Sequence, residues 1–179
     1  VYTSTSPELI PENSPIATAS ISDGKMTIVT DDPSQRYYYL LVFNNKYRIK
    51  VATRNINIPG IQNFRDLGGY ESAATGKSLR WGMIYRSAQI DSIPSGSRQE
   101  LKNIGIRTII DLRSENECHN YPQLHDDGFK IVHIPILTGN MEKILQGIRE
   151  DKIKTDTIYR LVERMNRELV TNHQKELKK

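Results

Sequence analysis

The chain has 179 residues, a length that can bury one good hydrophobic core or two small ones. Its 37% apolar and 26% charged residues are typical of a globular protein and exclude a disordered chain, and no apolar run approaches the ~18 residues that span a bilayer. The net charge of +4 is too modest to indicate a nucleic-acid partner, and a single cysteine, Cys118, excludes an internal disulfide and a cysteine-rich zinc site.

Residues 1–57 are expected to form short β-strands, because segments rich in Val, Ile, Thr and Tyr alternate with turn-forming residues. The expected strands are Val1–Thr5, Ile16–Ile21, Lys25–Thr30, Arg36–Phe43 and Tyr47–Arg54, with turns that include Ser22-Asp23-Gly24, Asp31-Asp32-Pro33 and Asn44-Asn45. This spacing predicts a small all-β sandwich of immunoglobulin or fibronectin type. Because the chain opens directly on a strand, we expect the sandwich to lack one or two strands at its amino end.

Residues 58–179 are expected to form a second domain of the α/β class, which begins where Ile58-Pro59-Gly60 breaks any strand. A strand is expected at Leu79–Tyr85. A helix should follow Ser97, because Ser97 and Glu100 match a capping box, and Gly105 suits the left-handed residue that ends a helix.

The rest of this domain alternates helices and strands. Ile106–Leu112 and Lys130–Ile136 have the apolar, β-branched character of strands that a parallel sheet buries on both faces. We therefore expect a partial parallel sheet with flanking helices. A second capping box begins at Ser114, and two carboxy-terminal helices are expected to be capped by Asn140 and Thr155.

Polar clusters stand at strand ends or in glycine-rich loops, where α/β sheets build their ligand sites. They are Arg65-Asp66, Arg86-Ser87 and Asp111-Leu112-Arg113-Ser114. The side chains of Asp111 and Arg113 point to one side of an extended chain, which suits an anion site, but an ion pair that anchors loops fits this spacing equally well. For Arg65 and Asp66 the structural interpretation is favoured, because adjacent loop residues face different ways.

Four blocks of residues follow one another in order along residues 58–137. They are Asn63-Phe64-Arg65-Asp66-Leu67-Gly68-Gly69-Tyr70, Arg80-Trp81-Gly82-Met83-Ile84-Tyr85-Arg86-Ser87-Ala88, Gly105-Ile106-Arg107-Thr108-Ile109-Ile110-Asp111-Leu112-Arg113-Ser114 with Glu117, and His133-Ile134-Pro135. Together they resemble the amino-terminal half of the bacterial tyrosine/serine protein phosphatase family. Four ordered blocks are far more specific than any one of them.

The resemblance implies a cysteine-dependent phosphatase that needs no metal or other cofactor. In that family a thiolate attacks phosphorus, and an arginine of a His-Cys-x-x-Gly-Lys-Asp-Arg-Thr loop binds the phosphoryl oxygens. The resemblance also implies that Arg86 and the Asp111–Arg113 block lie beside the loop as supporting residues. Arg65 and Asp66 complete the set of candidate phosphate-site residues. Family analogy favours the periplasm or the cell surface as the location.

Cys118 departs from the family's pattern. Leu124, not an arginine, stands six residues after it, and no glycine lies between them. We therefore interpret Cys118 as a structural thiol and expect the nucleophile loop to be absent from this chain. The 179 residues alone should then be inactive.

Two main hypotheses follow. The first is the front part of a phosphatase that acts on a phosphorylated protein or another phosphomonoester. The second is a non-catalytic, phosphatase-like protein that binds phosphorylated or anionic partners; adhesion or carbohydrate binding by residues 1–54 is a weaker third.

A partial sheet leaves an apolar edge, so we expect the carboxy-terminal half or a second copy to cover it, and a monodisperse monomer of 20.5 kDa would contradict this.

Overall fold

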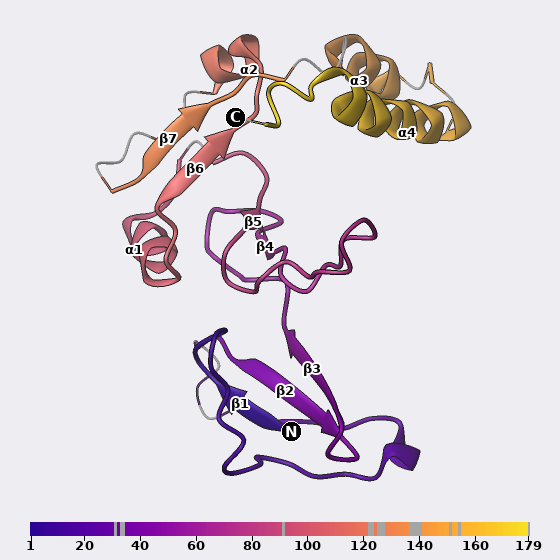
Figure 1. The fold of residues 1–179 in the computed structure, drawn as a ribbon. Coiled ribbons are helices and arrows are strands. Elements are labelled where there is room, and N and C mark those ends of the chain that lie inside the picture. The colour runs from indigo at the N-terminus through magenta and orange to yellow at the C-terminus, as the bar shows by residue number, and fades with distance from the viewer. Residues whose placement is uncertain are drawn as a thin grey trace. The chain divides into compact units, whose positions relative to one another are not determined.

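The computed structural model describes residues 1–30, 32, 35–90, 92–121, 124, 128–136, 141–150, 152–153 and 155–178. They form two compact units, Val1–Gly105 and Ile106–Lys179 (Figure 1). Among these residues no helix is both long enough and apolar enough to cross a membrane.

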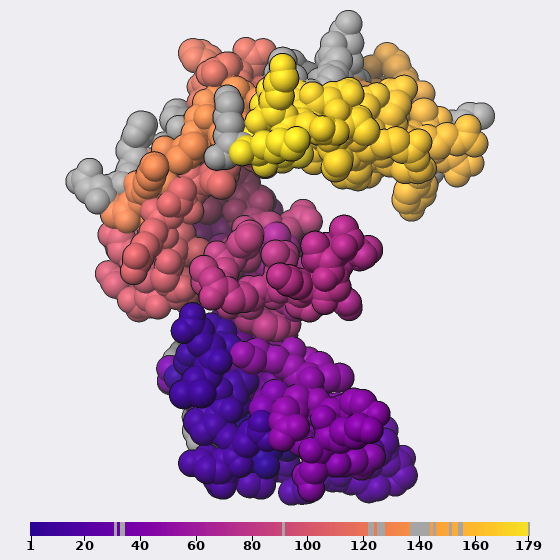
Figure 2. Space-filling view, in the orientation of Figure 1, coloured from indigo at the N-terminus to yellow at the C-terminus, as the bar shows by residue number. Residues whose placement is uncertain are grey.

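A three-stranded antiparallel sheet opens the first unit, in the order β1 (Tyr2–Ser4), β2 (Tyr38–Phe43) and β3 (Tyr47–Ala52). The β2–β3 hairpin turns at Asn44 and Asn45, whose φ angles of 50° and 56° are left-handed. Asparagine tolerates this conformation, and such a turn matches the twist of paired strands. The turn predicted at these residues is confirmed. Figure 2 shows the amino-terminal residues in indigo packed against this violet hairpin.

The strands predicted at residues 16–21 and 25–30 are wrong. The amide of Ile16 donates to the carbonyl of Val1, residues 21–23 form a short 3-10 helix (η1, Ile21–Asp23), and residues 25–30 have no regular structure. Val29 is 89% exposed, so its β-branched side chain has no sheet to pack on. Within the described part of residues 1–57 only one sheet forms, and the immunoglobulin-like sandwich is not confirmed.

The hydrophobic core of the first unit packs its amino-terminal sheet against Trp81. Ile10, Tyr38 and Trp81 are buried together, with Tyr2, Leu40 and Ala52 packed at the margin. Gly68 approaches Trp81 so closely that a β-carbon at this position would lie 2.4 Å from the Trp81 Cα. Only glycine fits here, so this glycine of the first block is required for packing.

A two-stranded antiparallel ribbon, β4 (Arg65–Asp66) and β5 (Tyr85–Arg86), follows, and then helix α1 (Ser95–Asn103). The strand predicted at 79–85 is reduced to β5, because Gly82 adopts a φ of 78° that breaks an extended chain. The capping box predicted at Ser97 is also wrong. The helix begins at Ser95, and the Ser97 hydroxyl is buried and donates to the carbonyl of Pro59 at 2.7 Å.

The second unit contains a parallel pair, β6 (Thr108–Asp111) and β7 (Lys130–His133), joined through helix α2 (Glu115–Asn120). The α/β class is confirmed, but the predicted burial on both faces is not found, since Ile110 is 59% exposed on this two-stranded sheet. The capping box at Ser114 is confirmed by its bonds to Glu117. Gly105, with a φ of 88°, lies just beyond α1 as predicted.

Two further helices complete the second unit, α3 (Met141–Arg149) and α4 (Thr155–Asn172), as predicted. The proposed cap at Asn140 and the side chain of Thr155 lie outside what the structure describes. Ion pairs between Arg167 and Glu163 and between Arg164 and Glu168 lie on the exposed surface of α4. Such pairs are typical of a solvated helix face.

Candidate functional site

Asp66 is the most enclosed ionisable residue in the described part of the first unit, with no exposed surface. Its Oδ1 accepts from the amide of Gly68 at 2.7 Å, and its Oδ2 accepts from the amide of Gly82 at 2.8 Å. Arg36 completes the set, with Nη2 2.7 Å from Oδ2. Asp66 therefore ties together three segments distant in sequence, and the structure gives it a scaffolding position in which no carboxylate oxygen faces solvent.

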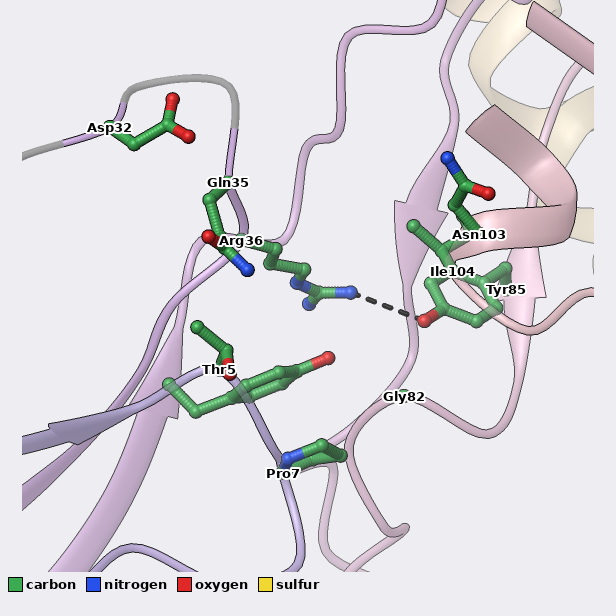
Figure 3. A pocket seen from close by; sticks show the side chains of 10 residues that line it. Thr5, Pro7, Asp32, Gln35, Arg36, Gly82, Tyr85, Asn103 and Ile104 are labelled. Atoms are coloured by element: carbon green, nitrogen blue, oxygen red, sulfur yellow. Dashed lines mark hydrogen bonds between the residues drawn. The ribbon is translucent and has the colours of Figure 1, made fainter. Parts of the chain in front are cut away.

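Arg36 lies at the wall of a cavity of about 460 Å³ within the first unit (Figure 3). It donates to the Tyr85 hydroxyl at 3.3 Å, and its guanidinium lies 4.9 Å from the centroid of the Tyr38 ring. Burial raises the pKa of both tyrosines, so both hydroxyls stay protonated at neutral pH. Because Asp66 balances the charge of Arg36, this cavity offers hydrogen-bond donors but little excess positive charge.

Arg54 binds the loop at Gly68, two residues after Asp66. Its Nη1 donates to the carbonyl of Gly68 at 2.7 Å, and its guanidinium lies 3.9 Å from the centroid of the Tyr70 ring and 4.9 Å from that of Trp81. Sequence analysis missed both Arg36 and Arg54, since it placed them in a separate sandwich. No local spacing connects them to Asp66, so only the folded contacts reveal their roles.

The Asp111 carboxylate and the Arg113 guanidinium meet in the second unit, as the spacing predicted. Arg113 Nη2 lies 2.8 Å from Asp111 Oδ2, and Nε lies 3.0 Å from Oδ1, so the pair is bidentate. Nη1 donates to the carbonyl of Tyr121 at 3.0 Å. Of the two interpretations left open by the sequence, these contacts match the ion pair that anchors a loop.

Cys118 lies beside this ion pair. Its Sγ is 3.7 Å from Asp111 Oδ2 and 3.6 Å from Nε2 of His133, and that Nε2 donates to the carbonyl of Arg113 at 2.7 Å. The Cys118 amide donates to the carbonyl of Ser114 at 3.0 Å. A nearby carboxylate and an amide already in use are the opposite of a phosphate cradle, which presents free donors around a thiolate.

Arg65 and Arg86 differ from the other three predicted site residues because both are exposed. They stand directly opposite each other in the β4–β5 ribbon. Neither side chain makes a hydrogen bond or an ion pair with any residue that the structure describes. The structure thus separates the five candidates into two exposed arginines and three residues held in internal contacts.

No group of His, Cys, Asp and Glu side chains within the described ranges could hold a metal ion.

Comparison with known proteins identifies the family of the chain. Residues 56–179 match the model of the Tyrosine phosphatase family. The chain belongs to this family.

Bacterial relatives share part of its length. The chain is 33% identical over 79 residues to the triple specificity protein phosphatase PtpB of Mycobacterium tuberculosis, a match that covers 44% of this chain and 27% of that protein. It is 32% identical over 81 residues to a protein of Cupriavidus necator assigned as a tyrosine-protein phosphatase, covering 45% of this chain and 29% of that protein. The chain therefore spans less than a third of the length of either relative.

The blocks singled out in the sequence make particular contacts in the structure. In the first block, Asp66 forms the buried ion pair with Arg36, and Gly68 packs directly against Trp81. The third block contributes the Asp111–Arg113 pair and the Ser114 cap. In these blocks the side chains of Asp66, Asp111 and Arg113 are engaged within the protein.

Proposed function

We propose that this chain is part of a cysteine-dependent protein-tyrosine/serine phosphatase whose nucleophile lies outside these 179 residues. The observation that carries the proposal is the family match over residues 56–179. The environment of Cys118 supports the second part, because its Sγ lies 3.7 Å from the ion-paired carboxylate of Asp111 and 3.6 Å from Nε2 of His133, which is bonded to a carbonyl.

The proposed reaction proceeds in two displacements. A cysteine thiolate forms a bond to phosphorus while the phosphorus–oxygen bond of the ester breaks, and the leaving oxygen takes a proton from a general acid. Water then attacks the phosphocysteine, the sulfur–phosphorus bond breaks, and inorganic phosphate leaves with the thiolate restored. Positive charge from arginine and backbone amides would stabilise the equatorial oxygens in both steps.

The contribution of this chain is to hold its own strand ends and turns in a fixed geometry. Asp66 binds Arg36 and two backbone amides, and Asp111 binds Arg113 and one backbone amide, so each holds a strand end and its following turn in one geometry. Such fixed geometry is the main requirement for positioning a phosphoryl group. Arg65 and Arg86 are proposed as the residues of this chain that meet the anion.

The test is hydrolysis of an aryl phosphate by two proteins, the 179-residue chain and the polypeptide encoded by the complete reading frame. We expect turnover by the complete polypeptide, none by the 179 residues, and unchanged turnover in the Cys118→Ser variant of the complete polypeptide. Turnover by the 179-residue chain that Cys118→Ser abolishes would overturn the proposal for the nucleophile. A complete polypeptide without turnover would favour a non-catalytic binding protein instead.

A further inference from the structure

The three-stranded sheet β1–β3 (Figure 1) has one face on the hydrophobic core of the first unit. Successive residues of a strand point to opposite faces, and directly opposite residues of neighbouring antiparallel strands share a face. Tyr38, Leu40 and Ala52 take the face that packs with Ile10 and Trp81. The other face, called the open face below, is formed in β2 and β3 by Tyr39, Leu41, Phe43, Tyr47, Ile49 and Val51.

Strand β2 has no polar side to present to solvent. Its six residues, Tyr38–Phe43, are all aromatic or aliphatic, and only Tyr38 is buried. An unbroken apolar run is typical of a strand that is buried on both faces, whereas a strand with one solvated face alternates apolar and polar residues. The sequence of β2 therefore suits a strand that lies between two apolar layers.

Strand β3 does alternate, but its apolar residues lie on the side away from the core. Arg48 and Lys50 share the face of the core residues, since they stand opposite Val42 and Leu40. Its residues on the open face are aromatic or aliphatic. Because alternation normally turns the apolar residues of a strand toward the interior, the pattern of β3 indicates that the open face is an interior surface.

The chemistry of the open face fits an apolar partner. None of its six side chains carries a charge at neutral pH. A charged group packed against it would lose its water without gaining an ion pair, which is costly. The partner is therefore apolar on the side that meets the sheet, as in the face-to-face packing of two sheets.

The size of the open face argues against a second copy of the chain as this partner. A stable interface between two proteins buries about 800 Å² on each side, and even an aromatic side chain covers only about 150–250 Å². On the open face Tyr47 and Ile49 are 60% and 51% exposed, and the other four side chains are half-buried already. A segment of the same polypeptide can use so small a surface, because it loses no translational freedom of a separate molecule on docking.

We propose that the open face is an internal interface of the complete polypeptide, covered by an apolar layer of extended chain from outside residues 1–179. With β1–β3 as one sheet and this layer as the other, residues 1–57 would belong to a two-layer sandwich. The proposal concerns the packing of the first unit and does not depend on phosphatase activity. A complete reading frame without residues beyond these 179 would overturn it.

The first test is the solvent access of Tyr47 in the polypeptide encoded by the complete reading frame. Hydroxyl-radical labelling is read by mass spectrometry, with the urea-denatured polypeptide as the reference. A covered Tyr47 should be labelled about tenfold more slowly in the native protein, whereas a side chain that stays 60% exposed should be slowed less than about twofold, which would overturn the proposal. Sedimentation of the same sample gives its oligomeric state. Slow labelling in a monomer supports the proposal, and slow labelling that is lost when a dimer dissociates would overturn it in favour of a second copy.

The second test is thermal unfolding of two lysine variants of the complete polypeptide. Ile49→Lys places a charge on the open face, and Leu9→Lys is the matched control because Leu9 is 71% exposed and lies outside the sheet. Ile49→Lys should lower the Tm by about 5 °C or more through an unpaired buried charge, and Leu9→Lys by less than about 2 °C. Failure of Ile49→Lys to fold while Leu9→Lys folds would have the same meaning as a large fall in Tm, and equal Tm values for the two variants would contradict the proposal. Since neither test measures turnover, failure of hydrolysis by the complete polypeptide leaves both intact.

Discussion

At the scale of single residues, two neighbours in one sequence block differ sharply in burial. Asp66 has no exposed surface and accepts from two amides and a guanidinium, whereas its neighbour Arg65 is exposed with no described partner. Adjacent residues of one sequence block thus have opposite exposure, because successive side chains in a strand face opposite sides.

Replacing Asp66 by Asn should therefore reduce stability. The change removes the negative charge, places amide hydrogens against backbone donors and leaves the Arg36 guanidinium nearly buried without its counter-ion. We expect the free energy of unfolding to fall by about 3 kcal/mol, measured by urea denaturation. Asp23→Asn, on the exposed short helix, is the control. A loss below about 1 kcal/mol in Asp66→Asn would contradict the scaffolding role.

At the scale of elements, one local pattern had two outcomes. Ser-x-x-Glu occurs at Ser97 and at Ser114, and only Ser114 caps a helix. Ser97 lies inside α1, 2% exposed, where its hydroxyl binds the Pro59 carbonyl. A tertiary contact overrode the local preference, because a buried hydroxyl without a hydrogen-bond partner is costly.

The two serines should respond differently to replacement by alanine. Ser114→Ala removes a cap and should cost about 1 kcal/mol, with faster hydrogen exchange at the Glu117 amide. Ser97→Ala should cost a similar amount through the Pro59 carbonyl, with faster exchange in the loop near Ile61 and little change in the first turn of α1. Fraying of α1 in Ser97→Ala, seen as exchange in its first turn, would show that Ser97 is a cap after all.

The sequence correctly predicted the turns and helix ends that single residues determine. The Asn44-Asn45 hairpin, Gly105 beyond α1 and the Ser114 cap follow from backbone preferences of single residues. The strand at 79–85 failed because Gly82 turns to give its amide to Asp66, and the strands at 16–21 and 25–30 failed because no partner strand pairs with them. Strand formation depends on a partner, which local sequence does not specify.

The site was predicted only where its residues are close in sequence. The Asp111–Arg113 contact follows from an i, i+2 spacing, whereas the contact of Asp66 with Arg36 crosses from one predicted domain to another. The facing position of Arg65 and Arg86 depends on the register of β4 and β5, which becomes known only once the strands pair.

At the scale of the whole molecule, the family match over residues 56–179 includes part of the first unit and all of the second. Ile110 and Leu112 are 59% and 44% exposed at the parallel pair. Coverage of this apolar surface by a further part of the polypeptide or by a second copy stays a prediction.

The most direct test of a nucleophile outside these residues is to trap the covalent intermediate. The polypeptide encoded by the complete reading frame is mixed with a phosphorylated substrate, quenched in acid and digested, and the phosphorylated cysteine is mapped by mass spectrometry. We predict phosphate on a cysteine outside residues 1–179, within a His-Cys-x5-Arg loop. Phosphate on Cys118 would contradict this prediction.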